Sequence, residues 1–227
     1  MANFLLRRFL STLLVMLGIS FVVFMIVHLV PGDPVRIMLG LQADQAKVEK
    51  IRHLMGFDRP LMVQYFEWLK NAIQGDLGES YITGQKVSEA VSQRLPATLS
   101  LAFAALFIGV IIALPAGVIS ALKSGTAWDY AAMVFSQIGV SIPDFWLGIM
   151  FILFFSLFLG WLPPSGFTKP SEDFGAWFRH LILPATTIGL ISASIMTRFI
   201  RSAVLEMISK IHVRTAKAKG LPERRIT

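Results

Sequence analysis

The chain has 227 residues and a formal net charge of +7; 55% of its residues are hydrophobic, only 15% are charged, and the mean hydropathy is +0.65. Soluble proteins carry about a quarter charged residues, so this composition excludes an ordinary soluble domain and predicts an all-α integral membrane protein. The sequence contains no cysteine, which excludes disulfide frameworks, thiolate metal sites and cysteine nucleophiles.

The first apolar segment predicts a retained membrane span. Residues 1–8 carry Arg7 and Arg8, and residues 9–30 contain no Asp, Glu, Lys or Arg. A signal peptide would have a shorter apolar core, of about 7–15 residues, and a small-residue cleavage site. We therefore expect 9–30 to be the first transmembrane helix. Because basic residues flank spans on the cytoplasmic side, residues 1–8 are expected to be a cytoplasmic N-terminus.

The next segment, residues 31–96, is expected to be a helical extracytoplasmic insert. It holds eight basic and eight acidic side chains, and it opens with Pro31-Gly32-Asp33-Pro34, which cannot continue a helix. Apolar periodicity predicts two amphipathic helices within it. They cover Gln45–Met55, with Val48, Ile51, Leu54 and Met55 on one face, and Leu61–Ile73, with Val63, Phe66, Leu69, Ala72 and Ile73 on one face.

Three further apolar segments complete a predicted bundle of four spans. Residues 97–122 form the second span, 123–130 a cytoplasmic loop, 131–159 the third span, 160–180 an extracytoplasmic loop, 181–200 the fourth span and 201–227 a cytoplasmic loop. A straight helix over 131–159 would be about 43 Å long. That exceeds a hydrocarbon core of about 30 Å, so we expect a kink near Pro143.

Asp144 is a carboxylate inside a hydrophobic stretch, which is costly and indicates a function. Capping of the helix that restarts after Pro143 is the structural alternative. Small polar residues lie nearby, including Gly139, and they equally suit tight helix packing. The candidates for a translocation path are Ser136, Gln137, Ser141 and Asp144.

The basic region near the C-terminus predicts a short helix with a defined end. Over 207–219, one helical face carries Met207, Ile208, Ile211, Thr215 and Ala218. Gly220 lies where a glycine commonly ends a helix, and Pro222 follows it. A helix lying on anionic lipid and a docking element for a cytosolic partner both fit this pattern.

No motif for covalent chemistry is present. Lys123-Ser124 follows Leu122 rather than the glycine of a phosphate-binding loop, and zinc-protease and nucleophile-elbow motifs are missing from the sequence. The four histidines are scattered, which favours packing over metal binding. The excess positive charge lies at Arg7, Arg8, Lys123 and in the segment from Arg198 to Arg225, which indicates membrane topology rather than a nucleic-acid partner.

Taken together, the motifs resemble the inner-membrane permease subunits of bacterial ABC importers, in the dipeptide, oligopeptide and nickel branch. In order, they are His28-Leu29-Val30-Pro31-Gly32-Asp33-Pro34, Leu54-Met55-Gly56-Phe57-Asp58-Arg59-Pro60-Leu61, Gly75-Asp76-Leu77-Gly78-Glu79-Ser80, Leu95-Pro96-Ala97-Thr98-Leu99, Ser141-Ile142-Pro143, Gly160-Trp161-Leu162-Pro163 and His180-Leu181-Ile182-Leu183-Pro184. Each motif is weak alone, but the ordered set covers the whole chain.

The resemblance implies that the C-terminal basic helix couples the permease to its ATPase. The family motif there is Glu-Ala-Ala-x3-Gly; aligned on Gly220, this chain matches it at Ala216 and Gly220 and departs from it at Arg214 and Thr215. The implied coupling residues are Arg214, Thr215, Ala216, Lys217, Ala218, Lys219 and Gly220. Family members continue into two further spans, so the resemblance implies an N-terminal fragment with four of six spans.

The resemblance also implies the function and the partners. We expect a subunit with no cofactor of its own, acting with a second permease subunit, cytosolic ATPase subunits that use ATP and magnesium, and an extracytoplasmic binding protein, in the bilayer of the bacterial inner membrane. Peptides are the expected cargo, with nickel chelates or glutathione as alternatives. A channel or secondary transporter that needs no ATPase is the alternative from another class.

Overall fold

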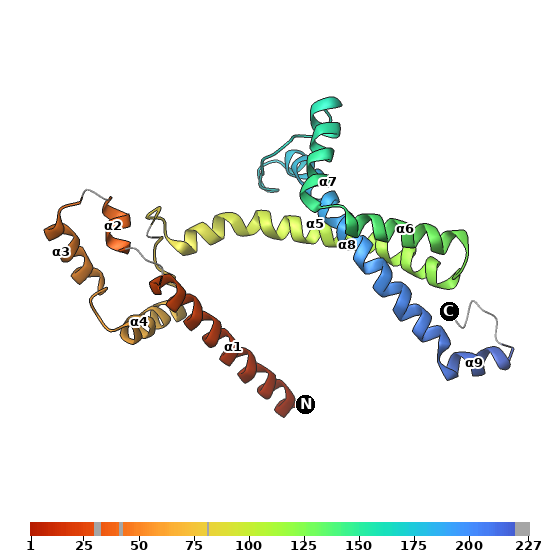
Figure 1. Cartoon of the computed structure of the whole chain (residues 1–227), viewed down its shortest axis with the longest axis horizontal. Helices are drawn as coiled ribbons and strands as arrows, with labels where there is room; N and C mark the ends of the chain where they lie inside the picture. Colours follow the sequence, from red (N-terminus) through yellow and green to blue (C-terminus); the bar gives the residue numbers. More distant parts are fainter. Residues whose placement is uncertain (30–32, 41–42, 81, 221–227) are drawn as a thin grey trace. The chain divides into compact units, whose positions relative to one another are not determined.

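The computed structural model describes residues 1–29, 33–40, 43–80 and 82–220 (Figure 1). The chain divides into two compact units, Met1–Gln93 and Arg94–Thr227. Among the described residues the only β pairing is one isolated bridge between Glu79 and Lys86. These residues contain three helices long and apolar enough to span a membrane, and a bent helix pair that gives a fourth if it is one span. The predicted all-α polytopic membrane fold is confirmed.

In the first unit, α1 (Ala2–Leu29) begins well before residue 9, because its first turns contain no proline or glycine to stop them. A short helix, α2 (Pro34–Leu39), follows after the interruption. Asp33 caps it by accepting a hydrogen bond from the Val35 N–H at 3.0 Å, and Pro34 occupies a first-turn position that needs no N–H. Pro31 and Gly32, which the sequence placed at this break, lie outside the described residues.

The two amphipathic helices of the insert have the predicted bounds. They are α3 (Gln45–Met55), which ends at Gly56 with φ +72°, and α4 (Leu61–Ile73). Arg52 of α3 forms an ion pair with Asp33, which joins α2 to α3. Burial raises the pKa of the Asp33 carboxyl, but the hydrogen bonds from Arg52 and Val35 and the charges of Arg52 and Arg36 together lower it by more, so the pKa lies below its usual value.

The long helix α5 (Val87–Leu122) begins ten residues before the span expected at 97–122 and contains Pro96 and Pro115. The expected boundary at Pro96 is therefore not a break in the structure. A proline costs one backbone hydrogen bond, but long helices in membranes accommodate this because neighbouring groups satisfy the freed carbonyl.

The expected third span is two helices rather than one. The chain forms α6 (Ala127–Ser141), α7 (Asp144–Phe151) and a π-helical continuation, η1 (Ile152–Phe158). The axis bends by 97° between α6 and α7. The bend lies at the predicted proline, because Pro143 forces the residue before it out of the helical conformation; Ile142 is extended, with φ −84° and ψ 126°.

The last two helices are α8 (Phe174–Ser209) and α9 (Ile211–Ala218). The start of α8 lies inside the loop expected at 160–180, because Asp173 caps it by accepting a hydrogen bond from the Ala176 N–H at 2.9 Å. Pro184 lies inside α8 without ending it.

Small residues hold the second unit together around α8. A Cβ placed on Gly117 of α5 would lie 2.9 Å from the Thr197 carbonyl oxygen of α8, and one on Gly139 of α6 would lie 2.6 Å from the Ser194 Cβ. The hydroxyl of Ser136 donates to the Ser194 carbonyl. Membrane helices associate through such close backbone approaches and interhelical hydrogen bonds, so these glycines determine how α5 and α6 pack on α8.

Candidate functional site

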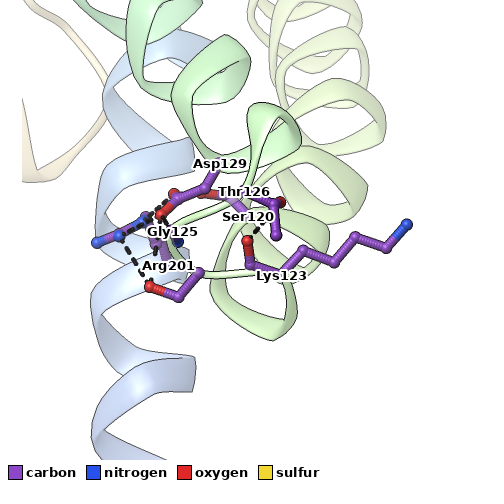
Figure 2. A network of polar contacts seen from close by, with 7 residues as sticks. Ser120, Lys123, Gly125, Thr126, Asp129 and Arg201 are labelled. Atoms are coloured by element: carbon purple, nitrogen blue, oxygen red, sulfur yellow. Dashed lines mark hydrogen bonds and ion pairs between the residues drawn. The ribbon is translucent and has the colours of Figure 1, made fainter.

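A buried carboxylate joins the ends of three helices in the second unit (Figure 2). Asp129, in the first turn of α6, is 5% exposed. The Arg201 guanidinium of α8 binds both of its oxygens, with Nε 2.7 Å from Oδ1 and Nη2 2.8 Å from Oδ2. Such a bidentate pair fixes orientation as well as distance, so α6 and α8 are held in one register at this end.

The same carboxylate accepts hydrogen bonds from the end of α5 and from the turn after it. The Ser120 hydroxyl lies 2.5 Å from Oδ1, and the Gly125 N–H donates to Oδ2 at 2.9 Å. Gly125 has φ +80°, a conformation that favours glycine. We call Ser120, Gly125, Asp129 and Arg201 the Asp129 cluster. In Figure 2 the Lys123 side chain extends away from it; its Nζ lies 5.4 Å from the centroid of the Trp128 ring.

Sequence reasoning missed the Asp129 cluster. Residues 123–130 were expected to be a loop and Arg201 part of a basic topology signal, yet Asp129 lies inside α6 and neutralises Arg201. A signal was present: an acidic and a basic residue lie at the ends of two predicted spans that meet the same side of the membrane. Part of the basic excess is therefore structural.

The prediction of a single helix over 207–219 is wrong, because this segment belongs to two helices, α8 and α9. The chain breaks at Lys210, which has ψ 150°, and α9 starts anew. Within α9, Val213 is buried and only 6% exposed. The predicted stop at Gly220 is found, with φ +75°, and Pro222 lies outside the described residues.

All seven of the implied coupling residues belong to α9 or to its end. Arg214, Thr215, Ala216, Lys217 and Ala218 contribute backbone to α9, and Lys219 and Gly220 follow it. The Lys219 N–H still donates to the Thr215 carbonyl at 3.1 Å. Thr215, Ala218, Lys219 and Gly220 are exposed, so α9 presents an accessible, sharply terminated helix end.

The structure does not gather the four path candidates at one place. Ser136 is fully buried between α6 and α8, which is a packing position. Gln137 and Ser141 are exposed on α6, and the Ser141 hydroxyl donates to the Gln137 carbonyl at 2.8 Å. Asp144 lies beyond the bend, in the first turn of α7.

Asp144 lines a cavity of about 540 Å³ between α7, α8 and the segment after η1. The lining is largely apolar, with polar groups from Asp144, Ser165, His180 and Thr187. The His180 Nδ1 lies 2.7 Å from the Ala176 carbonyl oxygen; because a carbonyl only accepts, this nitrogen carries the proton. Gly166 passes so close that a Cβ on it would lie 2.9 Å from the His180 Nε2.

Metal binding has no candidate here: among the described residues, no three His, Asp or Glu side chains gather as a site for an ion.

The long apolar helices, the broken span and the close packing define a multi-pass helical membrane protein. Residues 1–102 match the N-terminal region, and residues 113–227 the inner membrane component, of binding-protein-dependent transport systems. The chain belongs to this family. It is the permease subunit of a binding-protein-dependent ABC importer, a transport subunit of the inner membrane rather than an enzyme, and the resemblance drawn from its motifs is confirmed.

Relatives of known name agree with this. The chain is 37% identical over 229 residues to the oligopeptide transport system permease AppB of Bacillus subtilis, covering 100% of this chain and 72% of the relative. It is 37% identical over 247 residues to the di/tripeptide permease DppB of Pseudomonas aeruginosa, covering 100% and 74%. It is 36% identical over 223 residues to the glutathione permease GsiC of Escherichia coli, covering 98% and 70%.

Proposed function

We propose that α9 is the contact through which a cytosolic ATPase drives this permease in the import of peptides. The observation that carries the proposal is the geometry of α9. It is a short helix that is separated from α8 at Lys210, contains the buried Val213, and ends at Gly220. A chain without a nucleotide site changes conformation only if a partner binds its two states differently, and α9 offers an accessible surface for that partner.

The proposal places α9 and the N-terminus on the cytoplasmic side. Arg7 and Arg8 precede the apolar part of α1, and Lys210 and Lys219 flank α9. An excess of basic residues marks the cytoplasmic side of a span. Magnesium and ATP would then be bound by the ATPase subunits, and a binding protein would deliver cargo on the opposite side, to a path completed by a second permease subunit.

Peptides are the proposed cargo, because two of the relatives are named for oligopeptides and for di- and tripeptides. The cavity at Asp144 has matching chemistry, since a carboxylate among apolar walls suits the ammonium group and side chains of a short peptide. The alternative cargoes are glutathione, which appears in the name of another relative, and nickel chelates. Competition of each with the uptake of a labelled dipeptide tests these alternatives.

The coupling proposal predicts that Gly220→Val uncouples ATP hydrolysis from uptake. A β-branched residue in the left-handed conformation costs about 1–2 kcal/mol, although no heavy atom lies within 4 Å of the added Cβ. About 1.4 kcal/mol corresponds to a tenfold change, so we expect roughly tenfold slower peptide uptake, with ATP hydrolysis retained, in proteoliposomes containing the assembled transporter.

The matched control is Gly220→Asn, which adds a side chain of similar size that tolerates the left-handed conformation. It should keep most of the uptake. Full uptake by Gly220→Val would contradict the coupling assignment. Uptake by the purified chain without an ATPase would instead favour a channel or secondary transporter.

The cargo proposal predicts that Asp144→Asn raises the peptide concentration needed for half-maximal uptake. The amide has nearly the same shape but no charge to pair with a peptide ammonium group; an exposed charge pair contributes up to about 1 kcal/mol, or roughly fivefold in that concentration. Glu172→Gln removes an exposed carboxylate in the segment before α8, outside the cavity lining, and should leave uptake unchanged. Equal effects of the two substitutions would contradict a role for Asp144 in the path.

A further inference from the structure

Within the first unit, α4 packs against the C-terminal half of the membrane-spanning helix α1. The Tyr65 hydroxyl of α4 lies 2.8 Å from the Ser20 hydroxyl and 3.3 Å from the Leu17 carbonyl oxygen. The Tyr65 ring meets the Phe24 ring edge-on, with centroids 5.4 Å apart. Tyr65 is 5% exposed, so this contact fixes α4 to α1.

The contact lies inside the apolar stretch of α1 rather than beyond it. The helix ends at Leu29, five residues after Phe24, which at 1.5 Å per residue is about 8 Å along its axis. Ser20 lies about 14 Å from the same end. Nearer the C-terminal end of α1, the Nε2 of His28 lies 3.3 Å from the Oε1 of Gln64 in α4. The side-chain contacts of α4 with α1 therefore extend from about 2 Å to about 14 Å below the end of α1, a range that includes the depth of about 5–10 Å where interfacial amphipathic helices lie.

One side of α4 is apolar and uncovered. Met62, Phe66 and Ile73 are 50%, 59% and 79% exposed, and their spacing places them in one stripe of the helix. We call these three residues the α4 stripe. The opposite side is polar: Glu67 is paired with Arg59 in the turn before the helix, and Asn71 is exposed. Lys70 borders the α4 stripe, four residues after Phe66. Helix α1 contacts the side of α4 that carries Gln64 and Tyr65.

We infer that α4 is an interfacial membrane helix whose α4 stripe lies among the lipid acyl chains, on the side of the bilayer that the end of α1 reaches. Lipid is the occupant because the stripe continues the surface of α1, a membrane span with none of its apolar window buried among the described residues. Trp68, half-buried between the two faces, is of the type enriched at that depth. Part of the insert expected to be extracytoplasmic thus belongs to the membrane, whichever side carries the N-terminus.

The chain's lack of cysteine allows a direct test. Phe66→Cys and Ile73→Cys are labelled singly with a nitroxide in the assembled transporter, whose partner subunits carry no reactive cysteine, in nanodiscs of phosphatidylethanolamine and phosphatidylglycerol. Glu67→Cys and Asn71→Cys, on the polar side of the same helix, are the matched controls. Electron paramagnetic resonance then measures collisions of each label with oxygen, which concentrates in lipid, and with a water-soluble nickel chelate.

We expect labels at residues 66 and 73 to collide severalfold more with oxygen than with the nickel chelate, and labels at residues 67 and 71 to show the reverse preference. Nickel accessibility at all four positions would place α4 in water and overturn the inference. Immobilised labels at residues 66 and 73, shielded from both reagents, would overturn it in favour of a protein partner. Labels that report lipid at 66 but not at 71 also exclude general misfolding, because the two positions share one helix.

Discussion

Asp129→Ala is expected to lower the free energy of unfolding of the permease by about 3 kcal/mol, the lower end of the cost of breaking a buried ion pair from one side. The reason is the Arg201 guanidinium, whose side chain is only 23% exposed and would lose both carboxylate contacts. The Ser120 hydroxyl and the Gly125 N–H would lose their acceptor as well. Unfolding in mixtures of SDS and mild detergent, followed by circular dichroism, measures the difference.

Two further variants test whether the expected instability comes from breaking the ion pair or from the loss of one negative charge. Adding Arg201→Met to Asp129→Ala removes the unpaired charge and should recover part of the lost stability. Replacing both partners of a buried ion pair with apolar residues costs less stability than removing one partner and leaving the other charge unpaired. Glu206→Ala removes an exposed carboxylate of α8, 3.9 Å from Lys210, and should cost under about 1 kcal/mol. If Asp129→Ala were as stable as the unmodified chain, or the double variant no better than the single one, the Asp129 cluster would not hold the helices.

Gly117→Ala is expected to destabilise the second unit by about 1–3 kcal/mol, the range for forcing extra atoms into a packed interior. The new methyl group would lie 2.7 Å from the Ile200 Cγ2 and 2.9 Å from the Thr197 carbonyl oxygen. A backbone carbonyl cannot rotate away as a side chain can, so α5 would have to move off α8. The same unfolding measurement in SDS and mild detergent detects the loss.

Gly18→Ala is the matched control, because α1 has open space around that glycine. Alanine favours a helix by up to about 1 kcal/mol over glycine, so this control should be neutral or slightly stabilising. The two identical substitutions are thus expected to have opposite signs. A stabilising effect of Gly117→Ala would mean that α5 and α8 are not in the close contact described.

Local patterns predicted the elements of this chain better than their contacts. Helices α3 and α4 have the bounds read from apolar spacing, since caps and breaks such as Gly56 act on neighbouring residues. The apolar spacing did not predict which side of α4 is buried, because Phe66 and Ile73 of the predicted apolar face are exposed whereas Tyr65 is buried. The contacts of Tyr65 with α1 depend on residues about 45 positions away, which periodicity within one helix does not encode.

The prolines show the same limit. Pro143 bends the chain by 97°, whereas Pro96 and Pro184 lie inside continuous helices. A lone proline removes one hydrogen bond in every case, and the packing around the helix decides whether the axis breaks. The Asp129–Arg201 pair is 72 residues apart in the chain, so its discovery required knowing that α6 and α8 are neighbours.

The position of the Asp129 cluster along α8 gives the helix a mechanical property. Arg201 lies eight residues before the last residue of α8, Ser209, which leaves an overhang of about 12 Å beyond the ion pair. With α6 and α8 pinned together at Arg201, that overhang acts as a stiff lever with α9 at its tip. A rotation of about 5° at the pinned point moves the tip by about 1 Å, given that rise per residue. A force applied at α9 therefore reaches α5, α6 and α8 together, as a torque about one salt bridge.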